Sequence, residues 1–315
     1  LPDRQVHLIL ENEENEASHL ERDGTDTPSR YTAQWNDDLH HVLHTAASNE
    51  DHGYYQDYHG DETKLHRALS EGFAFQGELM PYRGSARGEP SAQLPPSAFV
   101  AFLQNHDQIG NRAFGERLHM IAPPEAVRAV SAIYLLLPQI PMLFMGEEWQ
   151  AAQPFVYFCD FKGALAQAVR EGRRKEFARF PSFRTRCAER ALPEPDDPAT
   201  FASAKLDWSA EREPRAAAAL RRYRRLLEIR HEELIPRMPL IGARAAHVER
   251  LADFAFRVVW RVGTAEEVVV AANLSDETVR SQAMHLGRLL WTDVPWVNDG
   301  TLSPWTVIWS LRAQQ

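Results

Sequence analysis

The sequence has little of three things that mark common protein classes: cysteine, excess basic charge and long apolar runs. Its 315 residues include only two cysteines, Cys159 and Cys187. Two thiols cannot form a disulfide framework, so we expect both cysteines to be ordinary small packing residues. We also expect the protein to be located in the reducing cytoplasm. No apolar run approaches the ~20 residues that span a bilayer, and the opening residues do not resemble a signal peptide.

Basic residues are outnumbered by acidic ones. The chain has 35 Lys and Arg against 44 Asp and Glu, a formal net charge of −9 at pH 7. Nucleic acids and anionic membranes bind basic surfaces, so we expect neither as a partner. The hydrophobic share of 44% is ordinary for a globular protein, and the length suits one large domain and one small domain.

What the sequence does contain is a polar cluster directly behind an apolar run, at residues 99–112. The apolar part predicts a buried parallel strand. The polar part includes Asn105, His106, Asp107 and Gln108. A solvated loop is the alternative, but so dense a cluster favours a functional site, since catalytic residues of α/β barrels lie where strands end.

The same order of apolar strand and acidic end occurs twice more. Residues 6–10 predict a strand that ends at Glu11, although an acidic loop would look the same. Residues 140–145 predict a buried strand that ends near Glu147. Together with the helices between them, these strands indicate βα units in a parallel sheet.

Helix signals lie between the strands. After a short strand that ends at Trp35, Asn36 is a plausible N-cap, with Asp38 in the first turn of a helix that reaches about Ala47. Apolar spacing predicts further helices at residues 124–138 and 216–233. We also expect a helix near residues 62–70 and a charged helical insertion at 163–180. Residues 192–207 predict a loop rich in Pro and Asp.

Three histidines on the helix that follows Asn36 share neighbouring turns, which raises the question of a metal site. They are His40, His41 and His44. No acid stands in a zinc-binding pattern with them, so we expect histidines that are hydrogen-bonded or solvated. We expect neither a metal nor another cofactor.

A loop rich in Gly, Pro and Ser covers residues 80–96. Long loops inside compact domains are usually functional. Tyr82 and Arg83 in this loop would suit the rim of a sugar site, and an ordinary surface arginine is an equal alternative.

The composition changes near Pro236. Beyond it, short β segments at residues 254–261, 267–273 and 305–311 predict a small antiparallel β-sandwich. Before it, the strand ends with catalytic residue types suggest a (β/α)8 TIM barrel, but only about four of its eight strands are found. Since the chain also lacks an initiating Met, we expect the C-terminal half of a TIM barrel at residues 1–235 and a β-sandwich at 236–315.

These residues resemble the α-amylase superfamily of glycoside hydrolases and, within it, most closely the maltooligosyltrehalose trehalohydrolases. The resemblance covers most of residues 6–235 and is specific in combination. The stretches that carry it are residues 9–13, 34–41, 81–84, 105–112, 145–149 and 203–208.

The resemblance implies a retaining hydrolase that cleaves the α-1,4 bond next to the trehalose end of maltooligosyl trehalose and releases trehalose. Glu11 matches the family's general acid/base, and Asp107 matches the second acid, which binds the sugar and stabilises the transition state. We expect the two carboxyl groups to converge on one sugar-sized hollow. The expected substrate contacts are Asn105, His106, Gln108, Arg83, Tyr82, Trp35 and Asp38.

The family's nucleophile is an Asp that precedes the position of Glu11, and residues 1–315 do not supply it. We therefore expect this stretch alone to be inactive and prone to aggregation, because a half-barrel has open sheet edges. Two alternatives remain open: another α-1,4-glucan enzyme, such as a branching or debranching enzyme, and a non-catalytic glucan-binding barrel.

Overall fold

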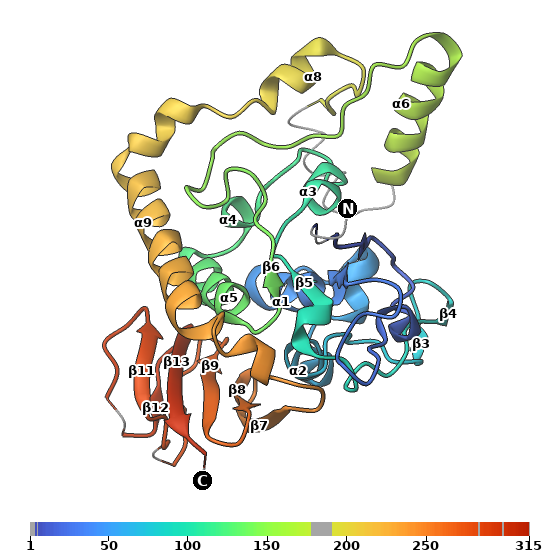
Figure 1. Ribbon diagram of the computed structural model, residues 1–315. Helices are drawn as coiled ribbons and strands as arrows, with labels where there is room; N and C mark the ends of the chain where they lie inside the picture. The colour runs from blue at the N-terminus through green and yellow to red at the C-terminus, as the bar shows by residue number, and fades with distance from the viewer. Residues whose placement is uncertain (1–3, 5, 178–190, 283, 298, 315) are drawn as a thin grey trace. The chain divides into compact units, whose positions relative to one another are not determined.

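The computed structural model describes residues 4, 6–177, 191–282, 284–297 and 299–314 (Figure 1). These residues form two compact units. The first combines the N-terminal part up to Leu103 with Ala122–Met142 and the part from Arg224 onward, and the second combines Gln104–Ile121 with Leu143–Tyr223. Cys187 and the end of the helix expected at 163–180 lie outside the described residues, whereas Cys159 is a half-buried free thiol.

A four-stranded parallel sheet organises the first unit. Its strands, in spatial order, are β1 (Ile9–Leu10), β2 (Ala33–Trp35), β5 (Phe99–Ala101) and β6 (Ile140–Pro141). The predicted parallel pairing is confirmed. The buried strand expected at residues 140–145 is wrong in length and burial, since only Ile140 and Pro141 pair and both are half-buried. Proline has no N–H to donate, which limits the ladder there.

Helices and short turns connect these strands. Asn36 caps the first long helix by accepting a hydrogen bond from the backbone N of Leu39 at 3.3 Å, which confirms the predicted N-cap. The connecting elements of the first unit are η1 (Ala17–Leu20), α1 (Asp37–Ser48), η2 (Gly53–Asp57), α2 (Glu62–Ser70), β3 (Leu79–Met80), β4 (Ser85–Ala86), η3 (Pro96–Ala98) and α5 (Pro124–Leu136).

Close packing between the connections and the sheet requires one glycine. Gly72 has a φ of +102°, and a Cβ there would lie 2.2 Å from the ring of Phe99 in β5. Phe73 packs edge-to-face on the same ring, with centroids 5.0 Å apart. The backbone turn that brings the two rings together is therefore open only to glycine.

The C-terminal part forms antiparallel sheets, as predicted. The larger sheet has the order β11 (Arg288–Thr292), β13 (Thr306–Ala313), β9 (Glu266–Asn273), β8 (Ala255–Val262) and β7 (Ala246–Ala252), and a smaller one pairs β10 (Val279–Arg280) with β12 (Thr301–Leu302). The strands β7 and β11 were not among the predicted segments.

This larger sheet packs on helices of the same unit (Figure 1). Trp309 of β13 stacks on Trp260 of β8, with ring centroids 5.7 Å apart, and its indole Nε1 donates to the carbonyl of Ala132 in α5 at 3.0 Å. Because of such contacts the first compact unit extends across Pro236. The domain boundary there stays a prediction.

The second unit consists of short helices and extended chain. It contains α3 (His106–Gly110), α4 (Leu118–Ile121), α6 (Gly163–Phe177), α8 (Pro198–Ser203), η4 (Trp208–Arg212) and the first part of α9 (Pro214–Ile229), after which η5 (Arg230–Leu234) and η6 (Met238–Leu240) belong to the first unit. The loop expected at 192–207 is wrong at α8, where Asp197 caps a helix that begins with Pro198. In the described part of the chain no helix has the length and apolar character needed to cross a bilayer.

Candidate active site

Glu11 directly follows β1 at the carboxyl end of the parallel sheet, and its side chain is exposed. Trp35 ends the neighbouring strand β2, which pairs in parallel with β1 through Leu10 and Gln34. Because neighbouring parallel strands end at the same edge, Glu11 and Trp35 lie at one edge of the sheet. Trp35 is half-buried, and its ring meets that of Phe102 edge-on at 6.0 Å.

Tyr82 and Arg83 lie in the turn of the β3–β4 hairpin. Arg83 forms an ion pair with Glu14, three residues after Glu11. Tyr82 is 52% exposed, and its backbone N donates to the carboxylate of Asp57 at 2.8 Å. The structure therefore brings these two predicted rim residues beside the loop that follows Glu11, where an aromatic ring and a planar cation suit contact with sugars.

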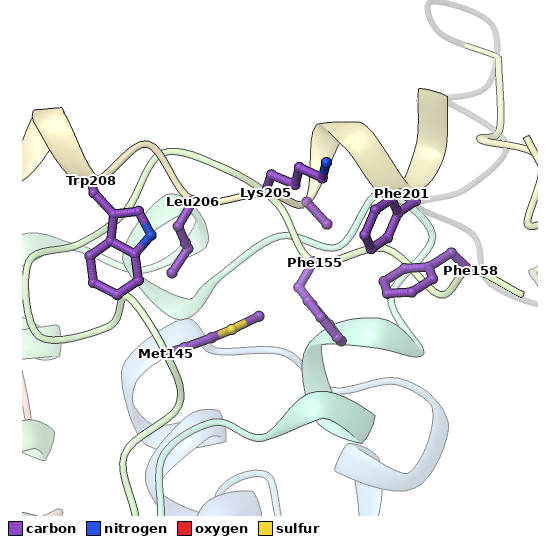
Figure 2. Close-up of a pocket in the computed structure, with 8 residues that line it drawn as sticks. Met145, Phe155, Phe158, Phe201, Lys205, Leu206 and Trp208 are labelled. Carbon is purple, nitrogen blue, oxygen red and sulfur yellow. The ribbon is translucent and has the colours of Figure 1, made fainter. Parts of the chain in front are cut away.

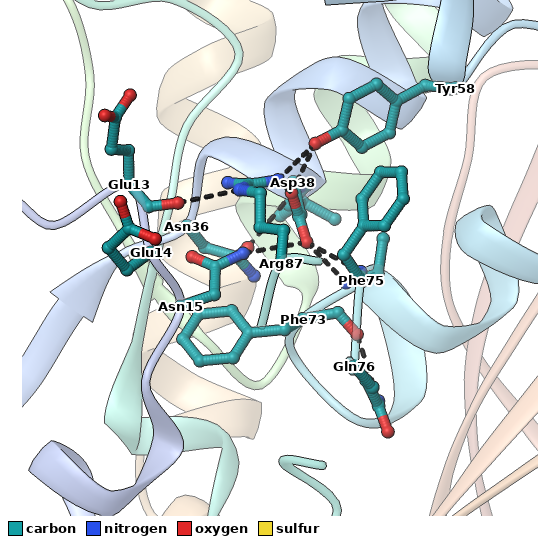
Figure 3. A network of polar contacts seen from close by, with 12 residues as sticks. Glu13, Glu14, Asn15, Asn36, Asp38, Tyr58, Phe73, Phe75, Gln76 and Arg87 are labelled. Atoms are coloured by element: carbon teal, nitrogen blue, oxygen red, sulfur yellow. Dashed lines mark hydrogen bonds and ion pairs between the residues drawn. The ribbon is translucent and has the colours of Figure 1, made fainter. Parts of the chain in front are cut away.

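Asp38 lies beneath this loop and has no exposed surface (Figure 3). Its Oδ1 accepts from the Tyr58 hydroxyl at 2.6 Å and pairs with Arg87. Its Oδ2 accepts from Asn15 Nδ2 at 3.0 Å and from the backbone N of residues 74 and 75 at 2.7 and 3.0 Å. The predicted contact of Asp38 with substrate would have to be indirect, because every face of the carboxylate is covered by protein.

The side chains of this buried cluster shift one another's pKa values. Burial alone would lower the pKa of Arg87, but Asp38 and Tyr58 offset it, so the pKa of the guanidinium is raised. Burial, followed by the charge of Asp38, raises the pKa of Tyr58 well above 10. The guanidinium of Arg87 therefore stays charged and the phenol of Tyr58 stays neutral across the physiological range.

The histidines of α1 are packing and hydrogen-bonding residues. His40 lies 2.5 Å from the Leu103 carbonyl through Nδ1 and 3.0 Å from the Tyr55 hydroxyl through Nε2. His44 Nε2 lies 2.7 Å from a carboxylate oxygen of Glu50. Burial lowers the pKa of His41 well below 6.5, and the charges of neighbouring side chains lower it further. The expected hydrogen-bonded state is confirmed for His40 and His44.

In the second unit, the polar cluster forms a single helical turn. Asn105 is buried and caps α3, with its Oδ1 accepting from the backbone N of Gln108 at 2.8 Å. His106 and Asp107 follow it, are both exposed, and approach each other to 3.6 Å. The capping bond uses one lone pair of the Asn105 side-chain oxygen and leaves the amide nitrogen outside the cap. The roles of these four residues stay predictions.

Glu147, the third acid expected at a strand end, lies in a turn six residues after β6 ends at Pro141. It is 2% exposed, and Gln104 Nε2 lies 3.3 Å from its carboxylate. The fully buried Arg117 donates to the carbonyls of Met145 and Gln153 at 2.9 and 2.7 Å. Burial lowers the pKa of Arg117, while the charge of Glu147 acts in the opposite sense. The buried carboxylate of Glu147 thus offsets part of the cost of burying the Arg117 cation.

A pocket of about 370 Å³ in the second unit is lined by residues that were not among the predicted site residues (Figure 2). Trp208 is 63% exposed and rests on the buried Trp149, with ring centroids 5.0 Å apart. Lys205 Nζ lies 5.0 Å from the ring centroid of Phe201. The clustering of aromatic residues at 155–158 and 201–208 was the available signal. The lining residues are Met145, Phe155, Phe158, Phe201, Ala204, Lys205, Leu206 and Trp208.

Comparison with known proteins adds relatives for both parts of the chain. Residues 243–309 match a family described as a domain of unknown function, DUF3459. The malto-oligosyltrehalose trehalohydrolase of Deinococcus radiodurans is 40% identical over 201 residues, which are 63% of this chain and 33% of that protein. The protein of the same name from Mycobacterium tuberculosis is 34% identical over 281 residues, which are 87% of this chain and 46% of that protein.

A solved structure agrees with these relatives. The crystal structure of a Salmonella typhimurium protein described as an alpha amylase superposes with a TM-score of 0.90 at 40% identity, over 99% of this chain and 52% of that one. The chain spans about half the length of that protein, and half or less of the curated relatives it matches.

Proposed function

We propose that this chain supplies the acid/base half of a glycoside hydrolase of the α-amylase family. The starting point is its homology to part of the malto-oligosyltrehalose trehalohydrolases. The reaction is hydrolysis of the α-1,4 bond next to the trehalose end of maltooligosyl trehalose, with retention and release of trehalose. The observation that carries the proposal is the exposed carboxyl of Glu11 at the carboxyl end of a parallel strand. The four parallel strands are, in this proposal, half of a (β/α)8 barrel.

In the proposed mechanism Glu11 protonates the oxygen of the leaving sugar and later takes a proton from the attacking water. Asp107 holds the hydroxyls of the sugar ring and stabilises the positive charge that develops on it. A retaining enzyme also needs a carboxylate nucleophile about 5–5.5 Å from the acid. The proposal requires that group from outside residues 1–315.

Contacts with the glucan come, in the same proposal, from Trp35, Tyr82 and Arg83, which lie at the sheet edge and in the adjoining hairpin. His106 and Gln108 contribute from the turn that contains Asp107. The proposed substrate is an α-glucan oligosaccharide, and the proposal includes no nucleic-acid partner, no membrane partner and no cofactor. The scarcity of cysteine supports the cytoplasm as the location.

The test is release of trehalose from maltooligosyl trehalose by the complete protein that contains this sequence. Glu11→Gln removes the proton donor, so kcat should fall by about 10²–10⁴. Glu13→Gln is the matched control, because Glu13 is an exposed acid two residues away whose side chain has no role in the proposal. Equal activity of the two variants would remove Glu11 from the mechanism.

The products separate the proposal from its two alternatives. Free trehalose supports it. Release of malto-oligosaccharides alone, or transfer of glucan branches, would indicate another α-1,4-glucan enzyme. Glucan binding with no turnover, unchanged by Glu11→Gln, would indicate a binding protein.

A further inference from the structure

We propose that Arg87 and Asp38 are positioning residues that fix the loop behind Glu11, and thereby the acid itself. This inference rests on the proposed function of Glu11. It concerns the segment of residues 11–15, which we call the acid loop, and the buried polar cluster beneath it (Figure 3).

The acid loop is held first through the carbonyls nearest to Glu11. The Asn12 carbonyl accepts from the side-chain amide of Gln34 at 2.8 Å. The Glu13 carbonyl accepts from Arg87 Nε at 2.7 Å. Gln34 belongs to β2 and is fully buried, and Arg87 is 5% exposed. The two donors are therefore fixed by the core and not by solvent.

The next two carbonyls are fixed as well. The Glu14 and Asn15 carbonyls accept from the backbone N of Gly88 and Glu89, each at 3.1 Å. These donors directly follow Arg87 in the chain, so side chain and backbone of one segment hold three successive peptide groups. With the bond from Gln34, all four carbonyls behind Glu11 have a protein donor.

Asp38 holds the donors in turn. Its carboxylate pairs with Arg87 and accepts from Asn15 Nδ2, so one fully buried anion connects the acid loop with the segment that clamps it. Asn15 has a φ of +57°, a left-handed conformation that its side-chain bonds to Asp38 and Gln34 help to maintain. The geometry points to a clamp, formed by Asp38, Arg87 and Gln34, that holds the acid loop and thereby fixes the position of Glu11.

Stability and positioning can be separated because another buried arginine of the chain also donates to backbone carbonyls, away from the acid loop. Arg230 is 4% exposed and donates to the carbonyls of Leu135, Leu137 and Gln139. Those residues are remote from the acid loop in the sequence and share no hydrogen bond with it in the described structure. Arg230→Lys is thus the matched control for Arg87→Lys.

The experiment compares the two variants in the complete protein, with trehalose release as the assay. Lysine keeps the charge beside Asp38, but its single ammonium cannot reproduce the fork that reaches both Asp38 and the Glu13 carbonyl. We expect Arg87→Lys to lower kcat by about 10–100-fold with KM changed by no more than about twofold, because a misplaced acid affects the chemical step. Arg230→Lys should lower the melting temperature without lowering kcat.

The outcome that would overturn the proposal is a kcat for Arg87→Lys equal to that of Arg230→Lys. If Arg87→Lys does not fold, Gln34→Met decides, because it removes the donor to the Asn12 carbonyl and should give the same fall in kcat. Glu11→Gln distinguishes failure of the positioning role from failure of the proposed function. If it abolishes turnover while the clamp variants do not change kcat, only the positioning role fails; if it leaves turnover unchanged, the proposed function fails.

Discussion

At the scale of single residues, two of the three buried arginines in the described part of the chain differ in their partners. Arg87 faces the carboxylate of Asp38, whereas Arg230 donates to three backbone carbonyls near the end of α5. Burial lowers the pKa of Arg230 to about 10, which still leaves it charged at neutral pH. A charged donor at the carboxyl end of a helix is favourable, because it meets unpaired carbonyls and the negative end of the helix dipole.

Replacing this arginine should therefore cost stability. Arg230→Met leaves buried carbonyls without donors, and we expect the free energy of unfolding of the complete protein to fall by about 3 kcal/mol. Urea denaturation measures it. Arg225→Met is the control, since Arg225 is exposed and pairs only with Glu228 at 3.3 Å among the contacts described; equal losses in the two variants would contradict the role of the buried bonds.

A histidine gives the second prediction at this scale. Burial, with the charges of Arg117 and Arg215, lowers the pKa of His119 to about 4. Between the ordinary value near 6.5 and this value, the unfolded chain binds a proton that the folded chain does not, so stability falls as the pH falls. The expected loss is up to about 1.4 kcal/mol per pH unit in that window, and none above it.

The measurement is thermal or urea unfolding of the complete protein at pH 7 and pH 5. His119→Gln should flatten the dependence, and the exposed His247→Gln should not. A pH dependence that is the same in the wild type and in His119→Gln would show that this histidine does not contribute.

Two asparagines show what single-residue patterns can and cannot predict. The sequence predicts the cap at Asn36 from the acids that follow it, and the structure confirms it. Asn105 makes the same kind of cap, but its place in a polar cluster predicts a sugar contact instead. A side chain that caps and a side chain that binds look alike in sequence, because both are polar residues at a strand end. The sequence also does not show that Asp38 is fully buried, which is what distinguishes a structural carboxylate from one that contacts substrate directly.

At the scale of elements, helices were predicted more accurately than strands. The bounds of α2 agree with the helix expected near residues 62–70, and the structure adds that Asp61 caps its start. The apolar run that predicts a strand from residue 99 is longer than β5, because Phe102 and Leu103 are buried without pairing in the ladder. Apolar runs report burial, and hydrogen-bonded pairing is a separate property.

The contact between β5 and the connection after α2 gives the prediction for elements. Gly72→Ala adds a Cβ 2.2 Å from the Phe99 ring at a φ of +102°, so it should lower the free energy of unfolding by about 2 kcal/mol or more. Gly60→Ala is the control, because Gly60 has a φ of +74° with nothing within 4 Å. Its cost is limited to about 1 kcal/mol of backbone strain. Equal melting temperatures for the two variants would contradict the clash.

At the scale of the whole molecule, the parallel sheet has two outer strands, β1 and β6. In the described residues β1 pairs only with β2. Val6 and Leu8, which precede β1, are 69 and 54% exposed, and Ile9 within it is 48% exposed. An apolar open edge is a template for association with other chains. We therefore expect residues 1–315, expressed alone, to aggregate and to release no trehalose.

Light scattering and the trehalose assay check this. Leu8→Lys places a charge at the edge and should reduce aggregation of residues 1–315 without restoring activity. A monodisperse and active wild-type preparation of residues 1–315 would contradict the prediction.

The composition of the compact units was the part of the architecture least accessible to sequence. Local spacing finds helices one at a time, whereas the second unit brings residues 104–121 together with residues 143–223 through contacts between distant segments. The change of composition near Pro236 is real, but the sheet beyond it packs on helices that precede it. Such long-range packing leaves no periodic signal.

The indole of Trp309 has a consequence for how this protein is made. It fills a place on α5, a helix translated more than 170 residues earlier, and donates to the Ala132 carbonyl there. During synthesis on the ribosome, the surface of α5 that Trp309 covers therefore stays exposed until almost all of this stretch has been translated. A stop codon shortly before that tryptophan would remove no proposed catalytic residue, yet it would leave the nascent chain to proteases and chaperones.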